Sequence, residues 1–225
     1  MWRLSYICID GSDSMKVFID LFCGLGGASA AFRQHPNWKV IAIDSNPDLI
    51  PHVHGMILAD VHQPVQTYTI IERLLLESLE HIQQVVVWMS PPCTEFSLAN
   101  PQRPDEPDLT LLLDGIKIRD MIGTLCDEHG IECLWAVENV KGAIEWFNEE
   151  LEQPWHQRIG PFYLWGTIPW IDFRDRKDGE HRKGDSNKGS RALRPNLRAL
   201  VPFPVSQGLL DSLEHQTSLF DFTES

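Results

Sequence analysis

The feature that most constrains the fold of this chain is a repeated alternation of short apolar runs with stretches of helical pattern. The apolar runs are short enough to be strands, and they cover residues 16–22, 39–44, 55–59, 85–89 and 132–137. The stretches between and after them predict helices over 28–34, 67–82, 109–129 and 206–215. Strands that alternate with helices predict βαβ units. The sequence therefore predicts an α/β fold with a mostly parallel central sheet and helices on both faces.

The chain length of 225 residues fits a single domain with a substantial core. Within residues 1–225 we expect three less regular parts. Residues 1–14 precede the first strand as an extension, 172–204 form a polar, basic loop region, and 216–225 form a flexible tail.

Composition excludes several classes of protein. No apolar run approaches the roughly 18 residues of a membrane span, and the N-terminus lacks the apolar core of a signal peptide. The five cysteines are irregularly spaced without a C-x-x-C pair, which favours neither a disulfide framework nor a metal site. We expect no membrane association, no metal, and a cytoplasmic location.

The charge of the chain is strongly negative but unevenly distributed. A formal net charge of −13 argues against a broad, non-specific grip on nucleic acid. Residues 174–198 nevertheless hold nine of the 19 Lys and Arg residues. This cluster is either a solvated loop or a loop that contacts phosphates, and the sequence leaves both interpretations open.

A glycine-rich turn follows the first apolar run. Residues 20–27 read Asp-Leu-Phe-Cys-Gly-Leu-Gly-Gly, a pattern that brings the backbone close to an anion, either a phosphate or an amino-acid carboxylate. Asp44 closes the next strand, where a carboxylate either binds ribose hydroxyls or caps a helix. Asp60 closes the third strand and either accepts a bond from an adenine amino group or caps a loop. The turn is not the G-x-G-x-x-G of a Rossmann dehydrogenase.

Cys93 is the candidate nucleophile. It follows Pro91 and Pro92 at the carboxyl end of a buried strand, the edge at which open α/β sheets bind ligands. A lone cysteine is more often a small core residue, but a proline-stiffened loop at a strand end is not a core position. Glu138 ends the next long strand, where a carboxylate is costly unless it belongs to a site. A thiol and an acid in one crevice favour covalent chemistry with proton transfer.

These segments, taken together, resemble a known family. Residues 18–27, 90–97 and 138–140 are similar to the first, fourth and sixth motifs of cytosine-5 DNA methyltransferases, and the similarity spans roughly residues 16–141. The resemblance implies a Rossmann-like, S-adenosylmethionine-dependent methyltransferase fold. It implies methyl transfer to carbon 5 of cytosine in DNA, with S-adenosylhomocysteine as product and the base flipped out of the duplex.

The resemblance also implies roles for individual residues. Cys93 would attack carbon 6 of the base, and Glu138 would hold or protonate nitrogen 3. Arg174 and Arg176 would complete the catalytic set, and Ser97 and Asn139 would bind the substrate. Asp44 would bind the cofactor's ribose and Asp60 its adenine. The full set of implied cofactor contacts is Phe22, Cys23, Gly24, Leu25, Gly26, Gly27, Asp44, Asp60 and Pro91.

The chain departs from the family pattern at several points. Thr94 stands where the family usually has Gln, and residues 172–176 supply the Arg-x-Arg of the eighth motif without its Gln. The tenth motif, Gly-Asn-x-Val, is absent, and residues 204–208 stand near its place. Only roughly 25 to 30 residues separate Arg176 from Pro204, too few for a folded target-recognition domain.

Three functions follow from this pattern. The first is a compact DNA methyltransferase of short or relaxed specificity, like those of phages and mobile elements, acting in a bacterial or phage-infected cell. The second applies the same chemistry to RNA or to a free or modified cytosine nucleotide. The third is a degenerate methyltransferase that binds and regulates a partner. A partner protein that supplies specificity fits the missing recognition region, and the sequence carries no signal for the oligomeric state.

Overall fold

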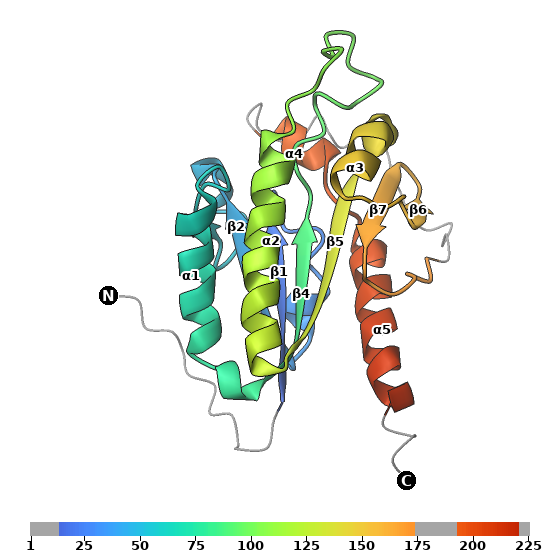
Figure 1. Cartoon of the computed structure of the whole chain (residues 1–225). Coiled ribbons are helices and arrows are strands. Elements are labelled where there is room, and N and C mark those ends of the chain that lie inside the picture. The colour runs from blue at the N-terminus through green and yellow to red at the C-terminus, as the bar shows by residue number, and fades with distance from the viewer. Residues whose placement is uncertain (1–13, 174–192, 221–225) are drawn as a thin grey trace.

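The computed structural model describes residues 14–173 and 193–220, and in this part of the chain a seven-stranded sheet has the order β3-β2-β1-β4-β5-β7-β6 (Figure 1). The strands β1 to β5 are parallel, whereas β7 is antiparallel to β5 and β6 to β7. The bounds are β1 Met15–Leu21, β2 Trp38–Asp44, β3 Ile57–Leu58, β4 Ile82–Met89, β5 Glu132–Val140, β6 Gln157–Ile159 and β7 Phe162–Gly166. The predicted Rossmann-like α/β fold, with a mostly parallel sheet, is confirmed.

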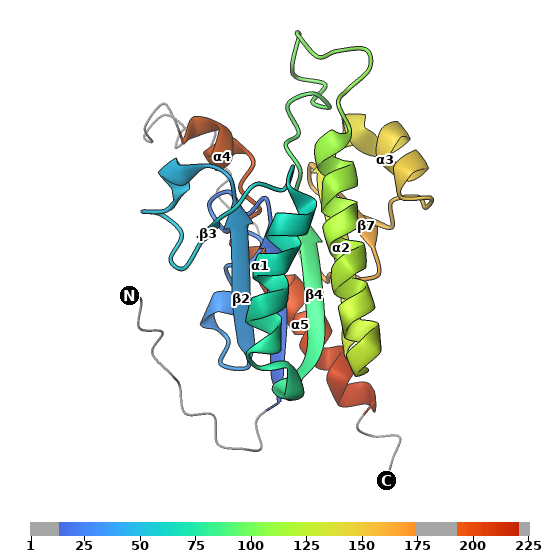
Figure 2. The same ribbon diagram turned by 60° about the vertical axis from the view of Figure 1, so that its left-hand side comes forward.

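Helices cover both faces of the sheet. Figures 1 and 2 show α1 and α2 side by side on one face and α5 on the other. The short helices α3 and α4 lie near the carboxyl ends of the parallel strands. The α-helices are α1 Pro64–Leu76, α2 Thr110–His129, α3 Ile144–Glu150, α4 Arg194–Arg198 and α5 Phe203–Phe220, and the 3-10 turns are η1 Phe32–Gln34, η2 Pro47–Leu49, η3 Leu79–His81 and η4 Lys141–Ala143.

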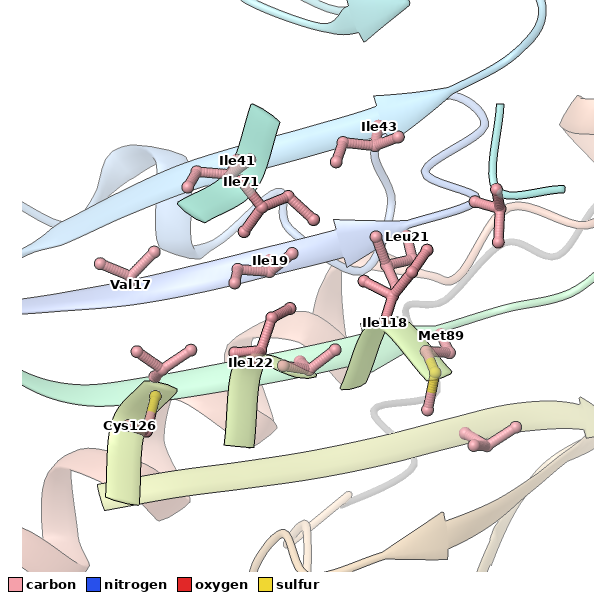
Figure 3. Packing of buried hydrophobic residues seen from close by; sticks show 14 of the residues in the cluster. Val17, Ile19, Leu21, Ile41, Ile43, Ile71, Met89, Ile118, Ile122 and Cys126 are labelled. Carbon is pink, nitrogen blue, oxygen red and sulfur yellow. The ribbon is translucent and has the colours of Figure 1, made fainter. Parts of the chain in front are cut away.

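The central strands are buried on both faces, which explains their unbroken apolar pattern. Val17 and Ile19 of β1 belong to the cluster that packs against α1 and α2, together with Ile71 and Ile118 (Figure 3). Phe18, between them, belongs to a second cluster with residues of α5. Because successive strand side chains point to opposite faces, each parallel strand separates two apolar layers.

The order of the strands reverses at β1. The chain runs outward from β1 through β2 to β3, then returns to β4 and β5 on the other side. In open α/β sheets the loops diverge at such a point and leave a crevice beyond the carboxyl ends of the strands. The glycine-rich turn follows β1 and the Cys93 loop follows β4, so both lie at this crevice.

The helix predicted over 28–34 is wrong. This segment forms turns that end in η1, with local bonds such as the Arg33 N–H to the Ser29 carbonyl at 3.1 Å and with two further backbone bonds to a distant side chain. Ser206 of α5 accepts a hydrogen bond from the Ala31 N–H at 3.0 Å and donates one to the Ala28 carbonyl. A contact across more than 170 positions of sequence therefore holds the backbone of these turns.

Other boundaries also differ from the sequence predictions. The strand β5 continues past Glu138 to Val140, because β7 pairs with those residues. The predicted loop 172–204 contains α4 and the start of α5, and α5 continues into the predicted tail as far as Phe220. The pair β6 and β7 was not predicted. In the described ranges, no helix has the length and apolarity to cross a membrane.

Candidate active site

A cavity of about 510 Å³ opens at the carboxyl ends of β1, β2, β4 and β5. Its volume lies within the range of roughly 300–1,000 Å³ typical of small-molecule sites. The glycine-rich turn and Asp44 line one side, and the Cys93 loop and Glu138 line the other. The tertiary structure therefore brings the principal predicted residues into one space.

The glycine-rich turn takes its shape from left-handed backbone conformations. Gly24 and Gly26 have φ values of 52° and 73°, and Phe22 has 61°, although it carries a side chain. Such a conformation costs on the order of 1–3 kcal/mol for a non-glycine residue and is frequent at functional sites. The Phe22 ring packs against Gly115 of α2, where an added Cβ would lie 3.4 Å from it. Nothing lies within 4 Å of a Cβ placed on Gly24, so the turn has open space beside it.

Asp44 ties the end of β2 to this turn. One carboxylate oxygen accepts the Gly24 N–H and the other accepts the Asn46 N–H, both at 2.9 Å. The side-chain cap of η2 is Asn46, which accepts the Asp48 N–H. The capping role that was an alternative for Asp44 therefore belongs to its neighbour. A carboxylate has about four lone-pair sites, so Asp44 keeps acceptor capacity toward the cavity that it lines.

Asp60 lines the cavity just beyond β3. Its carboxylate accepts the His62 N–H at 3.0 Å, so it also stabilises its own loop. His62 lines the cavity too, and its Nδ1 lies 3.3 Å from the Asp114 carboxylate of α2. Sequence reasoning did not single out His62, because its contact with α2 is formed only in the folded chain.

The C-terminal part of the chain closes the cavity behind the turn. A Cβ on Gly27 would overlap the Val201 carbonyl oxygen, so glycine is required for this close approach. Asn196 and residues 198–201 line the cavity, whereas residues 204–208 do not. The C-terminal segment that lines the cavity is therefore the one before Pro204, and sequence reasoning missed it.

Cys93 lies in the loop after β4 and is half-buried. Its carbonyl accepts the N–H groups of Phe96 at 3.1 Å and Ser97 at 2.9 Å, so the cysteine begins a tight turn. Burial raises the pKa of the Cys93 thiol, and the nearby charge of Glu138 raises it further. The free protein thus holds a thiol here, and a thiolate forms more readily when Glu138 is neutral.

Glu138 is a buried carboxyl group of β5 that lines the same cavity. Burial raises its pKa to about 7, and a hydrogen bond from the Ser90 hydroxyl opposes this rise. A carboxylic acid with a pKa near neutrality is suited to proton transfer at physiological pH. The pair of Cys93 and Glu138 therefore combines a nucleophile with an acid.

Several predicted site residues do not line the cavity. Asn139 is fully buried, and its side chain donates to the Pro91 carbonyl at 3.0 Å. Because Glu138 and Asn139 are adjacent in a strand, they point to opposite faces, and Asn139 holds the Cys93 loop. Ser97 and Gly26 shape their turns from outside the cavity. Arg174 and Arg176 lie outside the described residues.

The Cys93 loop is held by packing as well as by Asn139. Phe96 is buried and meets the Phe147 ring edge-on, with ring centres 5.1 Å apart. Gly142, at the start of η4, approaches so closely that a Cβ there would overlap the Phe96 carbonyl oxygen. The loop that carries Cys93 is therefore fixed from both ends, which favours a preorganised nucleophile.

Asp20 supports the turn from beneath. It is buried, and the Ser29 hydroxyl donates to its carboxylate at 2.6 Å. Burial raises the pKa of Asp20 to about 6 despite this bond. In the described ranges, no three His, Cys, Asp or Glu side chains are grouped so as to hold a metal ion.

Comparisons with known proteins add little to this geometry. No protein-family model and no curated protein matches the chain. Among solved structures, the chain is similar to the Entamoeba histolytica methyltransferase EhMeth, with 14% identity and a TM-score of 0.37. The matched region covers 72% of this chain and 56% of that chain, so this chain spans little more than half of that structure. A similarity at this level does not indicate a function for this chain.

Proposed function

We propose that this chain transfers a methyl group from S-adenosylmethionine to carbon 5 of a cytosine in DNA, through a covalent adduct with Cys93. The observation that carries the proposal is one cavity lined by the Cys93 thiol, the Glu138 carboxyl group and the glycine-rich turn. The first two residues suit the base, and the turn with Asp44 suits the cofactor. The motif resemblance in the sequence names the reaction that uses all of them.

The cofactor side fits a nucleoside joined to an amino acid. The glycine-rich turn has open space beside Gly24, and Asp44 retains acceptors that suit ribose hydroxyls. Asp60 offers a carboxylate to an adenine amino group, and Phe22 and Val61 supply apolar walls. When bound there, S-adenosylmethionine supplies an electrophilic methyl group and leaves as S-adenosylhomocysteine.

The residues on the other side of the cavity activate the base. The Cys93 thiolate attacks carbon 6 and forms an S–C6 bond, while Glu138 donates its proton to nitrogen 3. The resulting enamine has a nucleophilic carbon 5, which takes the methyl group. Loss of the carbon 5 proton to solvent then breaks the S–C6 bond, restores the ring double bond and returns the proton of nitrogen 3 to Glu138.

The electrostatics of the pair support this sequence of steps. Since the pKa of Glu138 is about 7, the acid is substantially protonated near neutral pH. A neutral Glu138 also removes the charge that raises the pKa of the Cys93 thiol. The same protonation state therefore favours both the proton donor and the thiolate, which is the combination the reaction requires.

Arg198 of α4 is proposed to contact the substrate. Among the described residues that line the cavity, it is the one Lys or Arg, and it is exposed. The carboxyl groups of Asp44, Asp60 and Glu138 line the same space. A guanidinium suits a phosphate or a base oxygen, whereas the acidic surroundings weaken attraction for a long polyanion. This charge balance keeps a free nucleotide as the second candidate substrate.

The test is a transfer assay with S-adenosylmethionine tritiated on the methyl group. The purified chain is incubated separately with duplex DNA, single-stranded DNA, RNA and deoxycytidine nucleotide, beside a Cys93→Ala control. Label in duplex DNA that is absent from the control supports the proposal. Label confined to RNA or nucleotide replaces DNA with that substrate. No label in any substrate, with cofactor binding intact, contradicts methyl transfer to cytosine by this chain alone.

A further inference from the structure

Ser90, which the motif analysis did not assign a role, lies opposite Glu138 in the sheet. The parallel register of β4 and β5 pairs Trp88 with Ala136 and Met89 with Val137, where β4 ends, so Ser90 follows β4 at the level of Glu138 in β5. Alternation along the strands places the side chains of Trp88, Ser90 and Glu138 on one face. Ser90 and Glu138 both line the cavity.

Ser90 accepts one hydrogen bond with its side-chain oxygen and donates another with its hydroxyl. The Trp88 indole N–H donates to the Ser90 oxygen at 2.7 Å, and an indole nitrogen has no acceptor capacity. The hydroxyl of Ser90 in turn donates to the Glu138 carboxyl group. A donor bonded to the oxygen polarises the hydroxyl and strengthens its own donation, because hydrogen bonds in a chain are cooperative. The series therefore runs from Trp88 through Ser90 to Glu138.

The backbone of Ser90 is also held in place. Its N–H donates to the Leu21 carbonyl at 3.3 Å, next to the glycine-rich turn. Trp88 itself is fully buried among large apolar side chains. The hydroxyl thus belongs to a residue that is held directly after the end of β4 by a backbone bond to β1.

We propose that Ser90 is a positioning residue that binds one oxygen of Glu138 as an acceptor, so that the acid's proton resides on the other oxygen and faces the cavity. A carboxylic acid has one O–H and one carbonyl oxygen, and a hydroxyl that donates to it selects the carbonyl oxygen. The remaining O–H is then available to a ring nitrogen. The catalytic consequence rests on the proposed function, but the orientation of Glu138 does not.

Cys93 provides a reporter that needs no substrate. The charged or titratable groups that line the cavity with Glu138 are Asp20, Cys23, Asp44, Asp60, His62, Cys93 and Arg198. The negative charge of Glu138 raises the pKa of the Cys93 thiol. Ionisation of Glu138 therefore appears as an inflection in the pH dependence of Cys93 alkylation, read by mass spectrometry of the Cys93 peptide.

The experiment compares iodoacetamide alkylation of Cys93 in the wild-type chain, Ser90→Ala and Ser90→Thr, with Ser78→Ala at the opposite edge of the sheet as control. The wild-type inflection is expected near pH 7. Loss of a hydrogen bond to a charged acceptor should move it upward by roughly one to two pH units in Ser90→Ala. Ser90→Thr and Ser78→Ala should retain it. An unchanged inflection in Ser90→Ala overturns the proposal.

Trp88→Phe supplies a second measurement should Ser90→Ala not fold. It keeps Ser90 but removes the donor to it, so a smaller upward shift is expected, and no shift in either variant contradicts the directed series.

Methyl transfer is measured in parallel. Ser90→Ala should lower kcat more than it changes KM and move the alkaline limb upward, with rescue by Ser90→Thr. Equal kcat at pH 6 contradicts the positioning role in catalysis. If the wild-type chain transfers no methyl group, the proposed function fails while the alkylation profile still decides the role of Ser90.

Discussion

The two sides of the cavity present different chemical groups. On the glycine side, the turn over residues 22–27 presents backbone, and its shape comes from left-handed conformations and a close approach to Val201. On the cysteine side, Ser90, Cys93 and Glu138 present side chains, and burial raises the pKa of both Cys93 and Glu138.

The two sides should therefore tolerate different substitutions. The glycine side depends on the backbone conformation of the turn, so an added methyl group disrupts it. The side chains of the turn contribute little chemistry. The cysteine side is a matter of charge, so replacing a single polar atom changes its chemistry without changing its shape. Substitutions on the glycine side should therefore change the shape of the cavity, whereas substitutions on the cysteine side should change its chemistry.

The largest effect is expected at Cys93. Cys93→Ser should reduce methyl transfer below detection, because an alcohol is a far weaker nucleophile than a thiolate. Calorimetric affinity for S-adenosylmethionine should stay within about twofold of wild type, since Cys93 lies on the opposite side of the cavity. Full turnover by this variant would remove the covalent mechanism, and loss of cofactor binding would show that the two sides are not separate.

Glu138→Gln should lower kcat by about 10²- to 10⁴-fold, because the amide keeps the shape of the acid but has no comparable proton to give. In the wild-type chain, activity that requires the protonated acid should fall as pH rises through about 7. The variant should lose this alkaline limb. A pH–rate profile of both proteins tests the assignment, and an identical alkaline limb in Glu138→Gln would refute it.

The same substitution should stabilise the fold at alkaline pH. The pKa of Glu138 is raised from 4.5 to about 7 on folding, so between these values the folded chain binds a proton that the unfolded chain has released. The free energy of unfolding therefore falls across this window, by about 3 kcal/mol from this group. Glu138→Gln should match wild type near pH 4.5 and exceed it at pH 8.

Urea denaturation at both pH values measures this difference, with Glu149→Gln on the surface of α3 as the control. The control should not change the pH dependence of stability. Equal stability of Glu138→Gln and wild type at pH 8 would mean that burial does not raise the pKa of Glu138. It would also weaken the assignment of this residue as a proton donor with a shifted pKa.

A smaller effect, and one confined to shape, is expected on the glycine side. Gly27→Ala forces a methyl group into the Val201 carbonyl oxygen and should destabilise the fold by about 1–3 kcal/mol. Gly123→Ala on α2 meets nothing within 4 Å and should stabilise by up to about 1 kcal/mol. Thermal unfolding of the two variants compares them directly. Equal behaviour would show that residues 200–201 do not pack against the turn.

The smallest effect is expected at Asp44. Asp44→Ala should weaken S-adenosylmethionine binding by about tenfold, through the lost acceptor and the loosened bond to Gly24, with little change in nucleic-acid affinity. Asp44→Asn keeps an acceptor oxygen and should lose less. Isothermal calorimetry with the cofactor, and a separate nucleic-acid titration, distinguish these outcomes. Unchanged cofactor affinity in Asp44→Ala would exclude this carboxylate from the site.

The α/β class, the strands β1, β2, β4 and β5, and the principal residues of the cavity could be predicted from the amino-acid sequence alone. These features arise from local rules, because buried parallel strands read as apolar runs and ligand-binding residues follow their carboxyl ends. Cys93 and Glu138 were therefore found from their positions at two strand ends. Residues 198–201 line the cavity, but no local rule specifies which part of the C-terminal region packs on the turn.

The way in which distant segments complete the site became visible only in the folded chain. Ser206 bonds to the backbone of Ala28 and Ala31, residues 198–201 line the cavity behind Gly27, and Asn139 donates to the Cys93 loop. The antiparallel pair β6 and β7 likewise forms against β5, beyond the region of clear pattern. Periodicity records the geometry of neighbouring residues, whereas these contacts join residues far apart in sequence, and their outcome depends on packing that no local pattern encodes.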